Sequence, residues 1–206
     1  ENVETIDNNG DKKKYKSFIY NSSFNGEIIS NLFSNLNSLN IIELHKLSET
    51  YLKIGYSNKD IKLHMIGKLQ TNKVKYIFPI FDYIHSLDNL KLAEKISNEQ
   101  IKKNKIIKIF IQINIGNERQ KNGILVEQLD NFYSKCTKDL GLNIIGLMCI
   151  PPNDNKTSIY FSKMQSLANN LNLKEISMGM SSDYFDAIKF NATYLRIGSK
   201  IFGERN

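Results

Sequence analysis

The chain has 206 residues, 41% of them hydrophobic, which suits one domain with a substantial core and argues against a tandem array. Its 28 Lys and Arg residues outnumber its 21 Asp and Glu residues, and the formal net charge of +7 suits a phosphorylated or polyanionic ligand but also suits mere solubility. Two cysteines in separate apolar segments, and no apolar run of about 20 residues, indicate no disulfide framework, no zinc site and no membrane helix.

The first 41 residues differ in composition from the rest of the chain. Four clustered lysines, Lys12, Lys13, Lys14 and Lys16, are followed by interleaved Asn and Ser residues. Such a segment buries too little apolar surface to offset the entropy of ordering its backbone. We therefore predict a low-complexity, partly disordered leader or insertion over residues 1–41 and a folded domain over residues 42–206.

From residue 61 onward, short strand-like runs alternate with segments of helical periodicity. We predict six strands, at residues 61–66, 82–87, 106–114, 143–150, 174–178 and 193–197. Five helices are predicted between them, at residues 69–78, 88–103, 125–139, 156–171 and 182–191. In the second helix we expect Asp88 to cap the first turn and one face to be buried, formed by Leu90, Ala93, Ile96 and Ile101.

Strands that are apolar on both faces, each followed by a helix, predict an α/β fold with a parallel sheet covered by helices. Six strand–helix units are visible, whereas a (β/α)8 barrel requires eight. The pattern alone leaves two possibilities: an open six-stranded sheet, or a barrel whose first units precede Glu1.

Two loops after the last two predicted strands combine glycine with serine, at residues 177–183 and 196–205. Glycine allows the backbone to approach a ligand closely, and free amides at a helix start attract anions. In barrels the corresponding loops often bind phosphate. The loops therefore predict an anion cradle, and the alternative is a pair of ordinary glycine turns with capping serines.

Arg196 is predicted inside the last strand, where an unpaired cation would be costly to bury. Its partner is expected to be either a structural carboxylate or a ligand atom at the mouth of a barrel. His64 and His85 also lie in predicted strands, and single histidines there are interpreted as hydrogen-bonded core residues rather than general bases. Lys121 is interpreted as a solvated loop lysine that could also meet an aldehyde.

Five motifs occur in a characteristic order, at residues 63–73, 112–123, 146–148, 177–181 and 196–205. Together they resemble the pyridoxal phosphate homeostasis protein family, whose fold is similar to the N-terminal barrel of alanine racemase. The resemblance implies a (β/α)8 TIM-type barrel, here truncated to about six βα units. It also implies binding of pyridoxal 5′-phosphate (PLP) and a role in cofactor buffering or delivery, without robust catalysis.

The resemblance also assigns residues to the cofactor. Arg196 would face the pyridine nitrogen, and the phosphate would be surrounded by Ser177, Gly179, Ser181, Gly198 and Ser199. The family holds PLP covalently on a lysine in its first strand, and no such strand occurs in this sequence. Glu1 and Asn2 look like the end of the family's second-strand motif, which places Asn2 near the cofactor and the lysine before Glu1.

Two other functions compete with PLP homeostasis. A PLP-dependent racemase shares the barrel but needs a second acid–base residue, which racemases obtain from an additional β-domain. A polyanion or nucleic-acid binder would use Lys102, Lys103, Lys105 and Lys108, but no aromatic residues are interleaved with them, so a solvated face is preferred.

The expected partners are PLP and PLP-requiring apo-enzymes. We expect no metal, no catalytic residue, no nucleic acid and no membrane, and a monomeric protein. No secretory signal pattern follows Glu1, so the expected location is the cytoplasm, with an organelle as the alternative.

Overall fold

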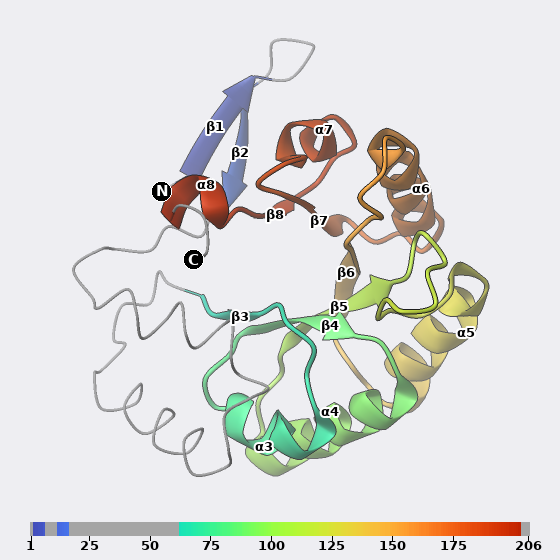
Figure 1. Ribbon diagram of the computed structural model, residues 1–206. Helices are drawn as coiled ribbons and strands as arrows, with labels where there is room; N and C mark the ends of the chain where they lie inside the picture. Colours follow the sequence, from blue (N-terminus) through green and yellow to red (C-terminus); the bar gives the residue numbers. More distant parts are fainter. Residues whose placement is uncertain (1, 7–11, 17–61, 203–206) are drawn as a thin grey trace.

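Six strands form one parallel sheet in the structure, a computed structural model that describes residues 2–6, 12–16 and 62–202. Neighbours in the sheet are also neighbours in the sequence, and every pairing is parallel. The sheet curls, with its helices outside the curve (Figure 1). In order, the strands are β3 (His64–Met65), β4 (Tyr83–Leu87), β5 (Lys108–Ile113), β6 (Ile144–Cys149), β7 (Glu175–Met180) and β8 (Tyr194–Arg196).

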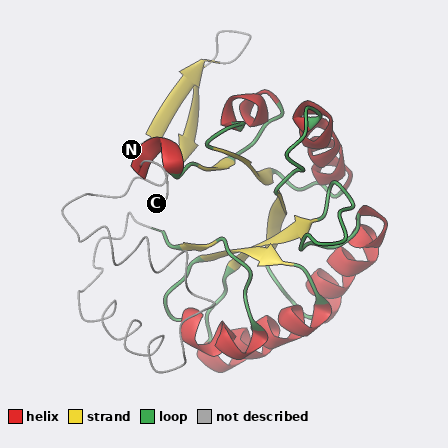
Figure 2. Cartoon of the chain, viewed as in Figure 1, coloured by secondary structure: helices red, strands yellow, loops and turns green. Residues whose placement is uncertain are grey.

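Helical segments connect consecutive strands and cover the convex side of the sheet (Figure 2). All six predicted strands and all five predicted helices are confirmed, with ends shifted by a few residues and the first strand shortened. The α-helices are α3 (Val74–Ile77), α4 (Leu90–Lys103), α5 (Leu129–Ser134), α6 (Thr157–Asn170), α7 (Tyr184–Lys189) and α8 (Ser199–Phe202). Two 3-10 turns, η1 (Thr71–Lys73) and η2 (Val126–Gln128), precede α3 and α5, and a π-helical turn, η3 (Lys135–Asp139), follows α5.

The start of α4 corrects the predicted cap. Asn89, not Asp88, is the capping residue, because its side-chain oxygen accepts a hydrogen bond from Leu92 N at 2.9 Å. Asp88 instead accepts a hydrogen bond from the Asn89 side-chain amide at 2.6 Å. Asp88 therefore orients the cap, which is an indirect role.

The buried face of α4 also differs from the prediction. Ala93 and Ile96 are fully buried as predicted, Leu90 is partly buried, and Ile101 is 78% exposed. Leu92, which was not predicted to lie on this face, is fully buried. At about 100° per residue, five residues rotate Ile101 roughly 140° away from Ile96. Ile101 therefore faces solvent.

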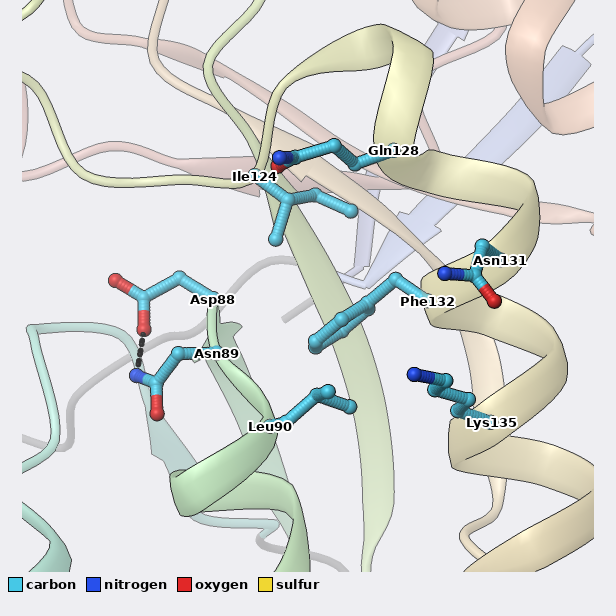
Figure 3. Close-up of a pocket in the computed structure, with 8 residues that line it drawn as sticks. All are labelled: Asp88, Asn89, Leu90, Ile124, Gln128, Asn131, Phe132 and Lys135. Carbon is cyan, nitrogen blue, oxygen red and sulfur yellow. Dashed lines mark hydrogen bonds between the residues drawn. The ribbon is translucent and has the colours of Figure 1, made fainter.

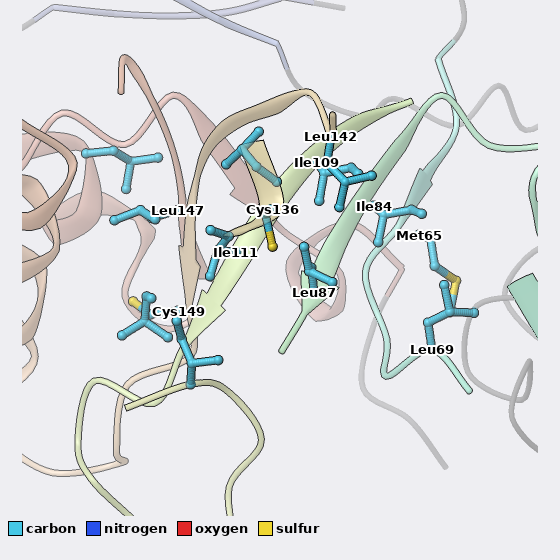
Figure 4. Packing of buried hydrophobic residues seen from close by; sticks show 14 of the residues in the cluster. Met65, Leu69, Ile84, Leu87, Ile109, Ile111, Cys136, Leu142, Leu147 and Cys149 are labelled. Carbon is cyan, nitrogen blue, oxygen red and sulfur yellow. The ribbon is translucent and has the colours of Figure 1, made fainter. Parts of the chain in front are cut away.

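The main core fills the layer between the sheet and the helices. Ile84, Ile109, Ile111 and Leu147 are completely buried in it, and Figure 4 shows these strand residues packed together. Cys136 and Cys149 lie in the same layer as free thiols. Burial raises the pKa of each thiol to about 12, so neither is poised to react.

A short antiparallel hairpin forms a separate two-stranded sheet near the start of the chain. It pairs β1 (Asn2–Ile6) with β2 (Lys12–Lys16). The sequence pattern did not predict these strands. Most of the predicted leader lies outside the described residues, so the boundary at residue 41 stays a prediction. Among the described helices, none is long and apolar enough to cross a membrane.

Candidate functional site

The sheet face opposite the main core carries a different set of side chains. Strand residues alternate between the two faces, so Tyr83 and His85 point inward while Ile84 packs outward. The same alternation turns Tyr194 and Arg196 inward from β8. The apolar members of this inner cluster are Tyr83, Phe110, Met148 and Tyr194. Its buried polar members are His64, His85, Ser177 and Arg196.

The polar members of the inner cluster form a continuous chain of hydrogen bonds. Arg196 Nη1 donates to Ser177 Oγ at 2.7 Å, and Ser177 Oγ lies 2.9 Å from His85 Nδ1. His85 Nε2 in turn lies 2.9 Å from His64 Nδ1. The prediction that both histidines are hydrogen-bonded core residues is confirmed. Their contact with each other, and with Arg196 through Ser177, was not predicted.

Two aromatic rings hold the histidines in place. His64 stacks on Tyr83 with ring centroids 3.9 Å apart, and His85 stacks on Phe110 at 4.2 Å. Burial lowers the pKa of His85 well below its ordinary value, and the nearby His64 and Arg196 lower it further. The electrostatic environment therefore favours a neutral His85.

Arg196 is only 7% exposed, and no carboxylate among the described residues forms an ion pair with it. Nη2 donates to the Cys149 carbonyl at 2.8 Å, while Nε finds no acceptor in the described part of the chain. Burial lowers the pKa of Arg196, although a guanidinium practically never loses its proton. Of the two predicted partners, a ligand atom fits this orphaned donor better than a structural carboxylate.

The two glycine and serine loops lie side by side. Ser181 Oγ accepts hydrogen bonds from Gly198 N at 3.1 Å and from Lys200 N at 3.4 Å. A Cβ added at Gly198 would meet no atom of the described residues within 4 Å, which leaves free space beside this backbone. Ser199 is exposed at the start of α8. The loops after β7 and β8 therefore converge around an open position.

The remaining predicted site residues have distinct positions. Gly179 has a φ of 90°, and an added Cβ would lie 2.6 Å from Ala187 Cβ, so glycine is required there by the backbone and by α7. Ser177 is completely buried beneath the loops. Asn2 begins β1, and its side chain lies outside the described residues.

Polar residues from the first two sequence motifs also come together. Lys68 Nζ donates to Asn122 Oδ1 at 2.8 Å, which joins segments 54 residues apart. Lys121 Nζ lies 2.6 Å from Glu118 Oε2 and donates to the Pro151 carbonyl at 3.0 Å. Lys121 is thus held by two partners, and its reaction with an aldehyde stays a prediction.

A surface pocket of about 340 Å³ lies apart from the inner cluster, between the start of α4 and α5 (Figure 3). Its polar side chains are largely exposed, and Asp88 and Asn89 bond to each other. It shares no residue with the predicted cofactor site. The pocket is lined by Asp88, Asn89, Leu90, Ile124, Gln128, Asn131, Phe132 and Lys135.

Comparison with known proteins identifies the family. The family described as alanine racemase, N-terminal domain, matches residues 59–206. A pyridoxal phosphate homeostasis protein of Aquifex aeolicus is 39% identical over 168 residues, which are 76% of this chain and 74% of that protein. The chain belongs to the pyridoxal phosphate homeostasis protein family.

Solved structures place the fold in the same family. PipY of Synechococcus elongatus PCC7942 is 28% identical to this chain, and its structure without PLP gives a TM-score of 0.68, covering 76% of this chain and 79% of PipY. The structure of PipY with PLP bound gives 0.66 and covers 76% and 78%. The predicted fold class is confirmed: the described sheet supplies six strand–helix units of the alanine racemase N-terminal barrel.

Proposed function

We propose that this protein binds PLP on the inner face of its sheet and takes part in PLP homeostasis by buffering or delivering the cofactor. The observation that carries the proposal is the buried Arg196 Nε, which lacks an acceptor among the described residues. A buried donor without a partner costs free energy, and the pyridine nitrogen of PLP is an acceptor that would satisfy it. PLP bound to the family member PipY supports this assignment.

Arg196 also bears on the chemistry of the bound cofactor. PLP supplies an electron sink to enzymes when its ring nitrogen is protonated. A guanidinium only donates hydrogen bonds, so a ring nitrogen facing Arg196 stays unprotonated and the sink is weakened. This suits storage of the cofactor better than carbanion chemistry, and we infer a non-enzymatic role in preference to a racemase.

The phosphate would occupy the open position where the two loops converge. Ser181 and Ser199 supply hydroxyl groups there, Gly198 leaves the space beside its backbone open, and Gly179 shapes the turn that brings Ser181 to Gly198. Ser177 has a different role in the proposal, because its hydroxyl is engaged by Arg196 and His85 and is fully buried. It holds Arg196 and does not contact the phosphate. Asn2 remains a proposed cofactor contact.

The four lysines considered for polyanion binding do not form one basic surface. Lys105 Nζ donates to three carbonyls, those of Phe78, Pro79 and Phe81, at 3.0–3.3 Å. Lys108 Nζ donates to Tyr83 OH at 3.2 Å. Two of the four ammonium groups are therefore hydrogen-bonded to other groups of the protein, which favours PLP over a nucleic acid as the ligand.

The proposed recipients of the cofactor are PLP-requiring apo-enzymes, and the proposed state of the protein is a cytoplasmic monomer.

The test compares Arg196→Gln with a control, Lys103→Gln. The control also replaces one positive charge by an amide, but at an exposed position outside the proposed site. We expect Arg196→Gln to weaken PLP binding about tenfold or more, because a charge-assisted hydrogen bond in a buried site is lost. Lys103→Gln should leave the affinity unchanged. Dissociation constants for PLP from equilibrium dialysis measure both. Equal effects of the two substitutions would contradict the proposed site.

A further inference from the structure

A chain of hydrogen bonds runs from Arg196 through Ser177 and His85 to His64. The chemistry of the guanidinium fixes which group donates in each of these bonds. A guanidinium can only donate, so Ser177 Oγ is the acceptor of the Arg196 Nη1 hydrogen bond. The hydroxyl keeps one hydrogen of its own, and His85 Nδ1 at 2.9 Å can accept it. If His85 donated through Nδ1 instead, Ser177 Oγ would receive two donors, and its own hydrogen would have no acceptor among the described residues in a fully buried position.

The tautomer of His85 follows from this direction. With Nδ1 as acceptor, the imidazole proton is on Nε2, where it is donated to His64 Nδ1. The ring cannot turn easily, because it is 1% exposed and stacked on Phe110. Neutral His85 thus orients the Ser177 hydroxyl, and Ser177 in turn receives Nη1 of Arg196. The other anchor of Arg196 is the Cys149 carbonyl.

We propose that His85 is a positioning residue for the cofactor: it acts through Ser177 to keep Arg196 Nε directed at the pyridine nitrogen. The inference rests on the proposed function, because it assumes PLP as the ligand of Arg196. His85 itself does not contact the cofactor. Its contribution is orientation of a buried cation whose Nε donor has no acceptor among the described residues.

Acidification would disrupt this arrangement. Four titratable or charged groups face His85: His64 from β3, Tyr83 from its own strand, and Tyr194 and Arg196 from β8. The neighbours from the other two strands, Phe110 of β5 and Ser177 of β7, carry no charge. No carboxylate among the described residues forms an ion pair in this cluster. Protonated His85 would add a second cation beside Arg196 and a second donor to Ser177. The orientation of Arg196 is therefore lost as His85 gains a proton.

Two substitutions in the full chain, His85→Asn and His85→Gln, distinguish the orientation of Arg196 through Ser177 from the packing of the His85 side chain. Asn places its amide near the position of Nδ1 and keeps an acceptor for Ser177, whereas Gln reaches toward Nε2 and loses it. The probes are PLP and its 1-deaza analogue, in which a CH group replaces the ring nitrogen. We expect His85→Gln to weaken PLP binding about tenfold and His85→Asn to stay within about threefold of the native protein. Both variants should bind the deaza analogue as the native protein does.

Additional measurements keep the outcome decisive. His85→Gln combined with Arg196→Gln should bind PLP no more weakly than Arg196→Gln alone. PLP affinity of the native protein should fall relative to His85→Asn at pH values well below ~6.5, the ordinary pKa of histidine, because only the native side chain titrates. Nitrogen NMR of the native protein should show His85 neutral and protonated at Nε2.

Several results would overturn the inference. They are unchanged PLP binding in His85→Gln, an equal loss for PLP and the deaza analogue, or a proton on Nδ1 of His85. Failure of the native protein to bind PLP would remove the proposed function itself. If native binding depends on Arg196 but not on His85, only the positioning role fails.

Discussion

The two glycines of the converging loops, Gly179 and Gly198, lack a side chain for different reasons. Gly179 has a left-handed backbone conformation and lies against Ala187 of α7, so its lack of a side chain serves the fold. Gly198 faces open space, and no neighbour in the described part of the chain excludes a methyl group. In the proposed function, this space receives the phosphate of PLP.

The two glycines make a matched pair for mutation. Gly179→Ala should lower the free energy of unfolding by about 2 kcal/mol or more, because it combines backbone strain with overpacking. Gly198→Ala should change stability by less than ~1 kcal/mol but weaken PLP binding at least about tenfold, because the methyl group enters the proposed phosphate position. Urea unfolding and PLP titration of both variants measure the two effects. A stable Gly179→Ala protein, or normal PLP binding by Gly198→Ala, would contradict this division.

Among the secondary-structure elements, helix ends and strand faces decide where side chains go. At the start of α4, two adjacent polar residues form the cap together: Asn89 accepts the hydrogen bond from the helix, and Asp88 orients the Asn89 side chain. The alternation along β4 sends Tyr83 and His85 to the inner cluster and Ile84 to the main core. A single strand thereby contributes to both stability and the candidate site.

The cap of α4 can be tested by mutation. Asn89→Ala should lower the free energy of unfolding by about 1 kcal/mol, because the Leu92 amide loses its acceptor. Asp88→Asn keeps an oxygen that can accept from Asn89 and should cost less than ~0.5 kcal/mol. Thermal unfolding of the two variants provides the comparison. A larger loss for Asp88→Asn would reassign the cap to Asp88.

For the molecule as a whole, the candidate site exists only because the sheet curls. Its hydrogen bonds join residues from β3, β4, β6, β7 and β8, and His85 and Ser177 are 92 positions apart. The unfolded chain cannot assemble such a site. A ligand that binds there stabilises the folded state alone.

PLP should therefore raise the unfolding temperature. At a free concentration about one hundred times the dissociation constant, binding adds roughly 2.7 kcal/mol, which corresponds to about 5–10 °C for a chain of this size. Arg196→Gln should reduce the shift at the same PLP concentration, and Lys103→Gln should preserve it. Differential scanning fluorimetry with and without PLP measures the shift. An undiminished shift in Arg196→Gln would indicate binding elsewhere.

The order of amino acids was sufficient to predict the six strands, the helices between them and the two glycine and serine loops, because hydrophobic periodicity and turn chemistry act over a few neighbouring residues. It also indicated that Arg196 needs a partner, since burial of a cation is costly wherever it occurs. The folded chain was needed to learn that Ser177 and the Cys149 carbonyl hold Arg196, that His64 and His85 touch, and that Ile101 is exposed. These outcomes depend on which strand faces and helix faces meet, and contacts between residues 19 to 92 positions apart form only when the sheet assembles.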